Sequence, residues 1–160
     1  MSLNEVDKIK SILSEVGANP VYSEHEAVRT SEDAVRVRGG KLSQGIKALL
    51  FTNGNEWIIV DIPADKKVDV GKVARHLGWS RGRLRMATPD EVLQKTGCEV
   101  GAVPPFGHKE NLKILVDEGV FDNQENSFNI GLRTHSAKVR TEDVRRVFDR
   151  IGAFVGEFSC

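Results

Sequence analysis

Four features of the sequence have residue types and spacings that could support chemistry. Lys47 stands in an apolar run, residues 97–107 are rich in glycine and proline, His25 stands between two glutamates, and Gly131 precedes His135 by four residues. An ammonium binds anions, glycine lets backbone N–H groups approach a ligand, and histidine exchanges protons near neutral pH. Each feature also has a structural explanation, such as Lys47 on the solvated face of a strand and His25 in an exposed loop.

The segment over residues 97–107 is the least regular part of the chain. It contains three glycines and two adjacent prolines, so it can form neither a regular helix nor a central strand. Its N–H groups suit oxyanions and carbonyls, but it lacks the Gly-Lys-Ser/Thr ending of a phosphate-binding loop. We therefore expect a shaped loop, which either binds a ligand or is only a long connection.

Several familiar catalytic motifs are absent. The chain has no Gly-x-Ser-x-Gly elbow and no His-Glu-x-x-His helix, and neither Cys98 nor Cys160 has a histidine partner or a metal-ligand spacing. We expect no covalent or zinc hydrolase, no metal and no cofactor. Two cysteines are too few for a disulfide scaffold, and neither a signal peptide nor a membrane span of about 18 apolar residues is present, so we expect a cytoplasmic protein away from membranes.

The charges balance over the whole chain. Lys+Arg of 23 against Asp+Glu of 23 gives a formal net charge of +0, so a nucleic-acid partner would have to bind a local patch. Basic residues gather over 75–85 without an acid, and over 133–150 with three acids among them. A solvated face explains both groups as well as a binding surface does.

Periodicity predicts an α+β protein of one domain over residues 1–160. The expected helices cover residues 6–16, 30–37, 69–77, 88–97 and 141–151, with Asp69, Thr88 and Thr141 as N-caps. The expected strands cover residues 21–23, 46–51, 57–62, 84–87, 112–116, 128–130 and 136–139, with a polar turn at 122–126. Because Asn53-Gly54 predicts a tight hairpin, we expect a mixed, largely antiparallel sheet flanked by helices.

Taken in order, these pieces resemble the YbaK/ProX aminoacyl-tRNA deacylases, which also occur as the editing domain of bacterial prolyl-tRNA synthetases. The resemblance runs over about residues 21–151. It rests on Tyr-Ser-Glu-His at 22–25, Thr-Ser-Glu-Asp-Ala at 30–34, Ile-Lys-Ala-Leu-Leu at 46–50, Asp-Val at 69–70, Leu-Gly at 77–78, Leu-Arg-Met-Ala at 84–87, the Gly-x-x-x-Gly-x-Val-x-Pro-Phe-Gly signature at 97–107, Leu-Val-Asp at 115–117 and Phe-Asn-Ile-Gly at 128–131. It implies that the sheet curls toward a barrel.

The resemblance also implies an activity. A member of this family hydrolyses the ester of a mischarged tRNA in trans, and Cys- or Ala-tRNA(Pro) is the substrate we expect. The partners would be the acceptor end of charged tRNA and a prolyl-tRNA synthetase. In this family the ribose hydroxyl of the terminal adenosine activates the attacking water, which explains why the chain has no catalytic triad.

Site residues follow from the same resemblance. Lys47 would hold the phosphate of the terminal nucleotide or other polar groups of the substrate. N–H groups of Gly101 and Ala102 would stabilise the oxyanion, an effect of roughly a hundredfold in rate or more per donor. The expected substrate-binding residues are His25, Val103, Pro104, Pro105, Phe106, Gly107, Gly131 and His135.

The chain departs from the family pattern at two places. Residues 102–105 are Ala-Val-Pro-Pro where cysteinyl-specific members have Gly-Ile-Ser-Pro, and Ala48 follows the lysine where alanyl-specific members have asparagine. Because one methylene changes discrimination by only about 1–3 kcal/mol, the amino acid stays open.

Two other functions remain in competition. A noncatalytic tRNA- or synthetase-binding module could have the same fold, although Lys47 and the glycine-rich loop favour an enzyme. A small-molecule ester or amide hydrolase would need its own general base, and the sequence indicates none.

Overall fold

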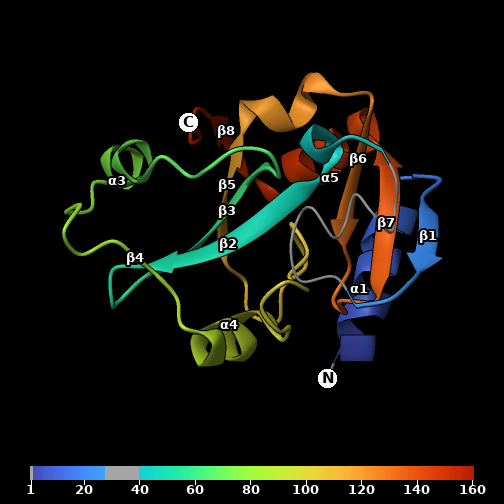
Figure 1. Ribbon diagram of the computed structural model, residues 1–160, viewed down its shortest axis with the longest axis horizontal. Helices are drawn as coiled ribbons and strands as arrows, with labels where there is room; N and C mark the ends of the chain where they lie inside the picture. The colour runs from blue at the N-terminus through green and yellow to red at the C-terminus, as the bar shows by residue number, and fades with distance from the viewer. Residues whose placement is uncertain (1, 28–39) are drawn as a thin grey trace.

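Two β-sheets and four α-helices make up the part of the chain that the computed structural model describes, residues 2–27 and 40–160 (Figure 1). The α-helices are α1 (Ser2–Glu15), α3 (Val70–Leu77), α4 (Pro89–Thr96) and α5 (Thr141–Ile151), and two short 3-10 helices are η1 (Leu42–Gln44) and η2 (Glu118–Asp122). The α+β class is therefore confirmed. The helix expected over residues 30–37 lies outside the described residues.

The larger sheet has five strands in the order β4-β2-β3-β5-β8. These strands are β2 (Ile46–Thr52), β3 (Trp57–Pro63), β4 (Arg85–Met86), β5 (Lys113–Asp117) and β8 (Phe154–Gly156). The predicted hairpin of β2 and β3 is confirmed as an antiparallel pair, and Asn53 Oδ1 closes its turn by accepting the N–H groups of Asn55 and Glu56 at 2.9 and 2.8 Å. β5 pairs in parallel with both β3 and β8, so the sheet is mixed.

The smaller sheet has three antiparallel strands in the order β1-β7-β6. They are β1 (Val21–Glu24), β6 (Glu125–Asn129) and β7 (His135–Arg140). The sheets do not close into a barrel: within residues 2–27 and 40–160 they are joined by an isolated bridge between Gly45 and Ser127. Without a continuous ladder between β2 and β6 the sheets cannot close on themselves.

Each face of the larger sheet carries its own hydrophobic cluster. The first cluster joins Ile59 and Val116 of the sheet to Ile9 of α1, Phe128 of β6 and Phe148 of α5. The second cluster lies on the other face. It contains Phe51, Ile58, Val60, Leu115, Val73 and Ala74 of α3, Leu84 and Phe158. The small sheet, α1 and α5 thus gather on one side of the larger sheet, and α3 covers the other.

The helix ends test the capping predictions. Asp69 Oδ1 accepts the N–H of Lys72 at 3.0 Å, and Thr88 forms the predicted capping box with Glu91. Thr141 does not cap α5: the N-cap is Arg140, and the Thr141 hydroxyl donates to Asn123 O at 2.5 Å instead. A threonine after a strand can satisfy a loop carbonyl as well as a helix end, and the sequence does not distinguish the two.

Two strand predictions also change. Glu125 and Asn126 belong to β6, so the polar turn expected over residues 122–126 is shorter, and β8 was not predicted because three residues show no periodicity.

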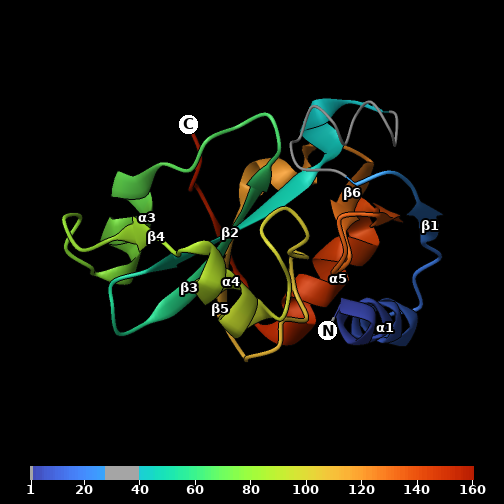
Figure 2. The ribbon, with the colours of Figure 1, turned by 60° about the horizontal axis from the view of Figure 1, so that its bottom comes forward.

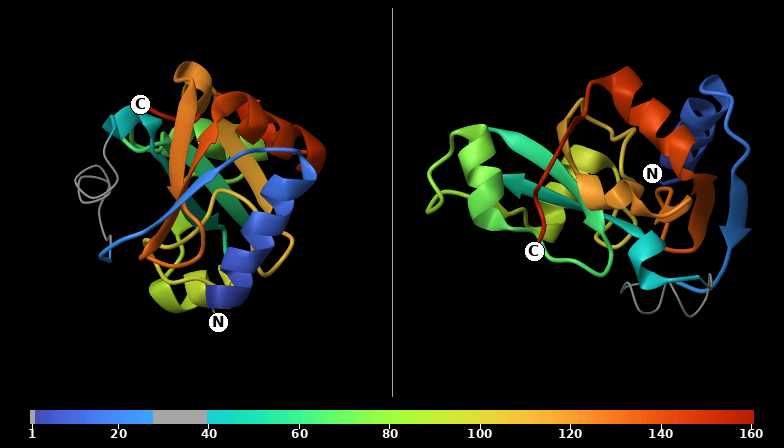
Figure 3. Two further views of the ribbon diagram at one scale, coloured as in Figure 1. Left: turned by 90° about the vertical axis from the view of Figure 1, so that its right-hand side faces the viewer. Right: turned by 90° about the horizontal axis from the view of Figure 1, so that it is seen from above.

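The elements lie along one long axis. Figures 1 and 2 show α3 and β4 at one end and α1, β1 and β7 at the other. The view from above in Figure 3 shows the same separation. Within residues 2–27 and 40–160, no helix has the length and apolar character that crossing a membrane requires.

Candidate active site

The glycine-rich loop over residues 97–107 packs against α1 and the core. A Cβ on Gly107, whose φ is +75°, would lie 2.7 Å from Cδ1 of Ile9 and 2.8 Å from Cδ1 of Ile12. The Phe106 side chain is fully buried, and its ring meets those of Phe128 and Phe148 edge-on with centroids 5.7 Å apart. Phe106, which we expected to bind substrate, therefore anchors the loop in the hydrophobic core.

A buried histidine fixes the proline part of the loop. His108 Nε2 donates to Pro104 O at 2.7 Å, and the His108 carbonyl accepts from Lys8 Nζ at 2.6 Å. Burial lowers the pKa of His108 to about 4, although its hydrogen bond to Pro104 opposes this shift in part. The imidazole is thus neutral near pH 7. Sequence reasoning missed His108, although its place directly after Gly107 was a signal.

The β6–β7 turn, which we define as residues 129–135 so that it includes the ends of both strands, binds three successive carbonyl groups of the loop. Arg133 donates to Val100 O through Nε at 2.8 Å and Nη2 at 2.6 Å, Asn129 Nδ2 donates to Gly101 O, and Gly131 N donates to Ala102 O at 3.1 Å. Arg133 also pairs with Glu99 at 3.0 Å. Asn129 and Arg133 were not predicted, although they flank the glycine of the Phe-Asn-Ile-Gly motif.

These contacts fix which loop N–H groups remain available. Ala102 N donates to Glu99 O at 2.9 Å and so closes a turn within the loop. Among the described residues, the N–H groups of Gly101 and Val103 have no protein acceptor. Pro104 and Pro105, both buried, have no N–H to offer.

Gly131 allows the turn to approach α1. Its φ is +119°, and an added Cβ would lie 2.9 Å from Glu5 Cβ and 3.3 Å from Val6 N. Only glycine adopts this backbone conformation without strain. The residue therefore lets its N–H reach the loop while the turn stays packed on the helix.

The pairing of β1 with β7 brings both predicted histidines to this turn. Glu24 lies opposite His135, and the N–H of His25 donates to Thr134 O at 2.9 Å. His135 Nδ1 lies 2.8 Å from Thr134 Oγ1, and its Nε2 lies 3.7 Å from Glu24 Oε1.

His25 also connects to the loop through two polar side chains. Its Nδ1 donates to Glu26 O at 2.7 Å, and its Nε2 lies 2.7 Å from Ser136 Oγ. Ser136 Oγ lies 3.3 Å from Asn129 Oδ1, and Asn129 in turn donates to Gly101 O. A series of polar contacts thus runs from His25 through Ser136 and Asn129 to the glycine-rich loop.

Lys47 lies on β2, and its side chain is half-buried. Alternation along the strand places its side chain on the face of Leu49, which packs on the second cluster, whereas Ala48 faces the first cluster with Val103. The structure therefore brings His25, Gly101, Ala102, Gly131 and His135 together, and it places the Lys47 side chain on the opposite face of β2 from Val103.

Asp61 is a buried acid that sequence reasoning missed. It lies opposite Ala48 on β3, is fully buried, and neither carboxylate oxygen has a hydrogen-bond partner among the described residues. Burial raises the pKa of Asp61 well above its usual range, so the protonated form is favoured. Aspartate in a strand of isoleucine and valine was a signal for it.

Other groups in the described part of the chain give no sign of nucleophilic or metal chemistry. Burial, with a smaller effect from the charge of Glu5, raises the pKa of Cys98 to about 12, so its thiol stays protonated. No three His, Cys, Asp or Glu side chains in residues 2–27 and 40–160 gather as metal ligands would.

Comparisons with known proteins agree on one family. Residues 25–147 match the family model described as an aminoacyl-tRNA editing domain. The chain is 36% identical to the multifunctional Ser/Thr-tRNA deacylase ProXp-y of Escherichia coli over 145 residues, which cover 88% of this chain and 86% of that protein. It is 29% identical to the proline–tRNA ligase of Thermosipho melanesiensis over 93 residues, 58% of this chain and 16% of the ligase.

A solved structure shows the same fold. It is described as that of a candidate trans-editing enzyme for prolyl tRNA synthetase and superposes with a TM-score of 0.81 at 24% identity. The superposition covers 98% of this chain and 97% of that chain.

Proposed function

This chain belongs to the aminoacyl-tRNA editing domain family, and on that premise we propose that it removes a wrongly attached amino acid from tRNA in trans. Water attacks the ester carbonyl, the bond from the carbonyl carbon to the ribose oxygen breaks, and the products are a free amino acid and a tRNA with a free 3′ end. The observation that carries the proposal is the glycine-rich loop, whose carbonyls at residues 100–102 are all bound by the β6–β7 turn.

The loop supplies the electrostatic part of the reaction. Attack on an ester places negative charge on the carbonyl oxygen, and N–H groups held in place before the reaction stabilise that charge. Ala102 N donates to Glu99 O, so we assign this role to the N–H groups of Gly101 and Val103. Each of these N–H donors accelerates the reaction on the order of a hundredfold.

The remaining groups bind the substrate. We propose that Lys47 binds the phosphate of the terminal nucleotide and that Gly131, His25 and His135 line the aminoacyl pocket. A hydroxyl of the terminal ribose activates the water, which needs no base from the chain. Charged tRNA is the partner, a prolyl-tRNA synthetase is a second one, and the reaction takes place in the cytoplasm.

Small amino acids are the proposed substrates. The relative that is 36% identical is named for Ser-tRNA and Thr-tRNA, which places serine and threonine first. Alanine and cysteine on tRNA(Pro) come next, because the matched ligase belongs to the proline system.

The direct test is hydrolysis of a panel of tRNAs charged with serine, threonine, alanine, cysteine or proline. We expect loss of the label from one of the first four, and a drop of about 100-fold in kcat/KM for Lys47→Ala, because a charge-assisted contact is lost. Lys66→Ala, an exposed lysine in the turn after β3, is the matched control. If no charged tRNA is hydrolysed, the chain is not a deacylase and the alternative function, a noncatalytic binding module, is favoured. Equal rates for both variants would remove Lys47 from the site.

A further inference from the structure

A rigid, cationic lobe stands at the end of the molecule opposite α1 (Figure 1). We define the arginine lobe as residues 70–86, which comprise α3, the following loop and β4. Trp79 and Leu84 anchor the loop in the second hydrophobic cluster. Two turns fix its backbone, through Arg83 N to Ser80 O at 3.0 Å and Leu84 N to Arg81 O at 3.3 Å.

Three arginines of the lobe have no counter-charge. Arg75, Arg81 and Arg83 are exposed, and none forms an ion pair with another residue in the described part of the chain. Two acids contact other residues of the lobe: Glu56 accepts from Trp79 Nε1 at 3.1 Å, and Glu157 lies 3.9 Å from Lys72. The lobe therefore presents a positive surface despite the net charge of +0.

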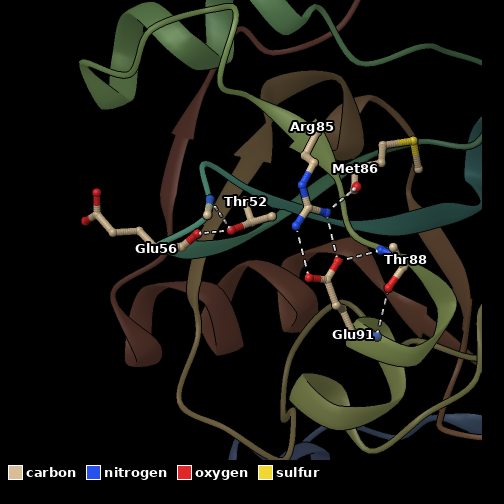
Figure 4. A network of polar contacts seen from close by, with 7 residues as sticks. Thr52, Glu56, Arg85, Met86, Thr88 and Glu91 are labelled. Atoms are coloured by element: carbon tan, nitrogen blue, oxygen red, sulfur yellow. Dashed lines mark hydrogen bonds and ion pairs between the residues drawn. The ribbon is translucent and has the colours of Figure 1, made fainter.

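Arg85 differs from these three. Figure 4 shows its guanidinium facing the carboxylate of Glu91 across β4 and α4, with hydrogen bonds of 2.8 and 3.0 Å. The hydrogen bond from Arg85, together with a smaller effect of the bond from Thr88 N, lowers the pKa of Glu91 to about 2. Arg85 thus joins β4 to α4 and is already paired with an acid.

We call the second basic group of the sequence the neutralised group, because four of its five arginines have an acid partner. Arg133 pairs with Glu99, Arg140 with Glu142, Arg146 with Asp143, and Arg150 with Glu15. Arg145 lies over the ring of Phe121 at 3.9 Å. Of the two groups that the sequence indicated, the arginine lobe alone keeps several arginines available for an anionic partner.

The length of strand β2 gives the spacing between the glycine-rich loop and the end of the lobe at Arg85. Ala48 faces the cluster that contacts Val103 of the loop, and Thr52 pairs with Arg85 of β4. Four residues of strand span about 14 Å. Four stacked nucleotides at a rise of 3.4 Å also span about 14 Å, which is the length of the unpaired 3′ end of a tRNA.

We propose that the arginine lobe binds phosphates of the tRNA acceptor stem while the unpaired 3′ end reaches the glycine-rich loop. The identity of this partner rests on the proposed function. Arginine suits the task because its planar guanidinium binds phosphate oxygens in pairs.

The test compares two double variants that each remove two positive charges. Arg81→Gln with Arg83→Gln changes the lobe, and Arg140→Gln with Arg150→Gln changes the neutralised group. Binding of uncharged tRNA is measured against salt concentration by fluorescence anisotropy. We expect the lobe variant to bind about tenfold more weakly at low salt, with the slope of log K against log salt reduced by about 2, and the second variant to match the wild type.

A short substrate separates this inference from the proposed function. Hydrolysis of an aminoacylated CCA trinucleotide, which has no stem, should proceed at the same rate in the lobe variant and the wild type. A wild type that cleaves neither substrate would refute the deacylase, while tRNA binding would still decide the role of the lobe. The inference is overturned if the wild type does not bind tRNA, if both double variants lose affinity equally or not at all, or if the trinucleotide reaction falls with the lobe variant.

Discussion

The glycine-rich loop and the arginine lobe differ in how their polar groups are paired. Around the glycine-rich loop, Arg133, Asn129 and His108 all donate to backbone carbonyls of the same chain. In the arginine lobe, Arg75, Arg81 and Arg83 face solvent without an acid partner among the described residues. Internal hydrogen bonds fix a geometry, whereas unpaired surface charges remain available to attract a partner. The glycine-rich loop is therefore suited to catalysis, and the arginine lobe is suited to binding.

The largest effect is expected at Gly131. Gly131→Ala would place a Cβ 2.9 Å from Glu5 Cβ at a φ of +119°, so the turn must move off α1 and release the loop. We expect a loss of kcat/KM of about 100-fold or more, and a lower unfolding free energy by roughly 1–3 kcal/mol. Deacylation assays and chemical denaturation measure the two effects.

Gly54→Ala is the matched control, because Gly54 has a φ of +100° but no atom within 4 Å of its added Cβ, and it lies in the β2–β3 turn. It should lose stability through backbone strain and keep its activity. Similar activity losses in both variants would mean that strain alone, and not the release of the loop, explains the Gly131 result.

The second effect is a pH dependence that we expect from His108 beside the glycine-rich loop and not from the arginine lobe. The folded pKa of His108 is about 4 against about 6.5 for a free histidine, so the unfolded chain binds more protons between these values. The contribution of neutral His108 to stability is complete above about pH 6.5 and is lost as the pH falls toward 4. It amounts to on the order of 3 kcal/mol. The arginines of the lobe keep their charge throughout this range.

His108→Gln keeps an amide donor near Pro104 O. We expect the unfolding free energy of this variant to change less with pH between about pH 4 and 6.5 than that of the wild type. Urea denaturation at several pH values measures the change. An equally steep loss of stability in this variant would assign the pH dependence to other groups.

The smallest effect is expected at the edge of the lobe. Glu91→Gln removes the charge that holds Arg85 but keeps an oxygen for Thr88 N. Freeing Arg85 adds one cation to the lobe, so tRNA binding at low salt should strengthen by about twofold to threefold, with a slightly steeper salt slope. Fluorescence anisotropy measures both. The matched control is Glu110→Gln, which frees Lys95 from its ion pair at the C-terminal end of α4.

The same substitution changes the acid stability of the protein. Because the pKa of Glu91 in the folded state is about 2, its contribution is present above about pH 4.5 and lost as the pH falls toward 2. The variant should lack this transition.

Local sequence signals predicted local structure well. The Asn53-Gly54 turn, the Asp69 cap and the Thr88 capping box depend on side chains a few residues apart, and all three are confirmed. How far the sheets close was not predicted, because it depends on pairing between segments about 80 residues apart, and among the described residues an isolated bridge between Gly45 and Ser127 joins them. Thr141 failed for a related reason, since its partner Asn123 is 18 residues away.

In the candidate site, too, the sequence predicted the residues of local motifs, whereas the structure shows their contacts. Gly101, Gly131 and the two histidines belong to motifs that the sequence displays, and the structure gathers them. It also shows that Ala102 N is engaged with Glu99 O, a turn hydrogen bond that motif spacing does not reveal.

By itself the sequence determined the helix caps, the central hairpin, the glycine-rich loop and the resemblance to editing domains, because each depends on residue types at fixed short spacing. Only the tertiary structure decided which donors hold the loop and which arginines remain unpaired. The reason is physical: an ion pair or a hydrogen bond between residues far apart along the chain forms only where the fold brings them within about 3 Å, and the sequence does not show where that happens.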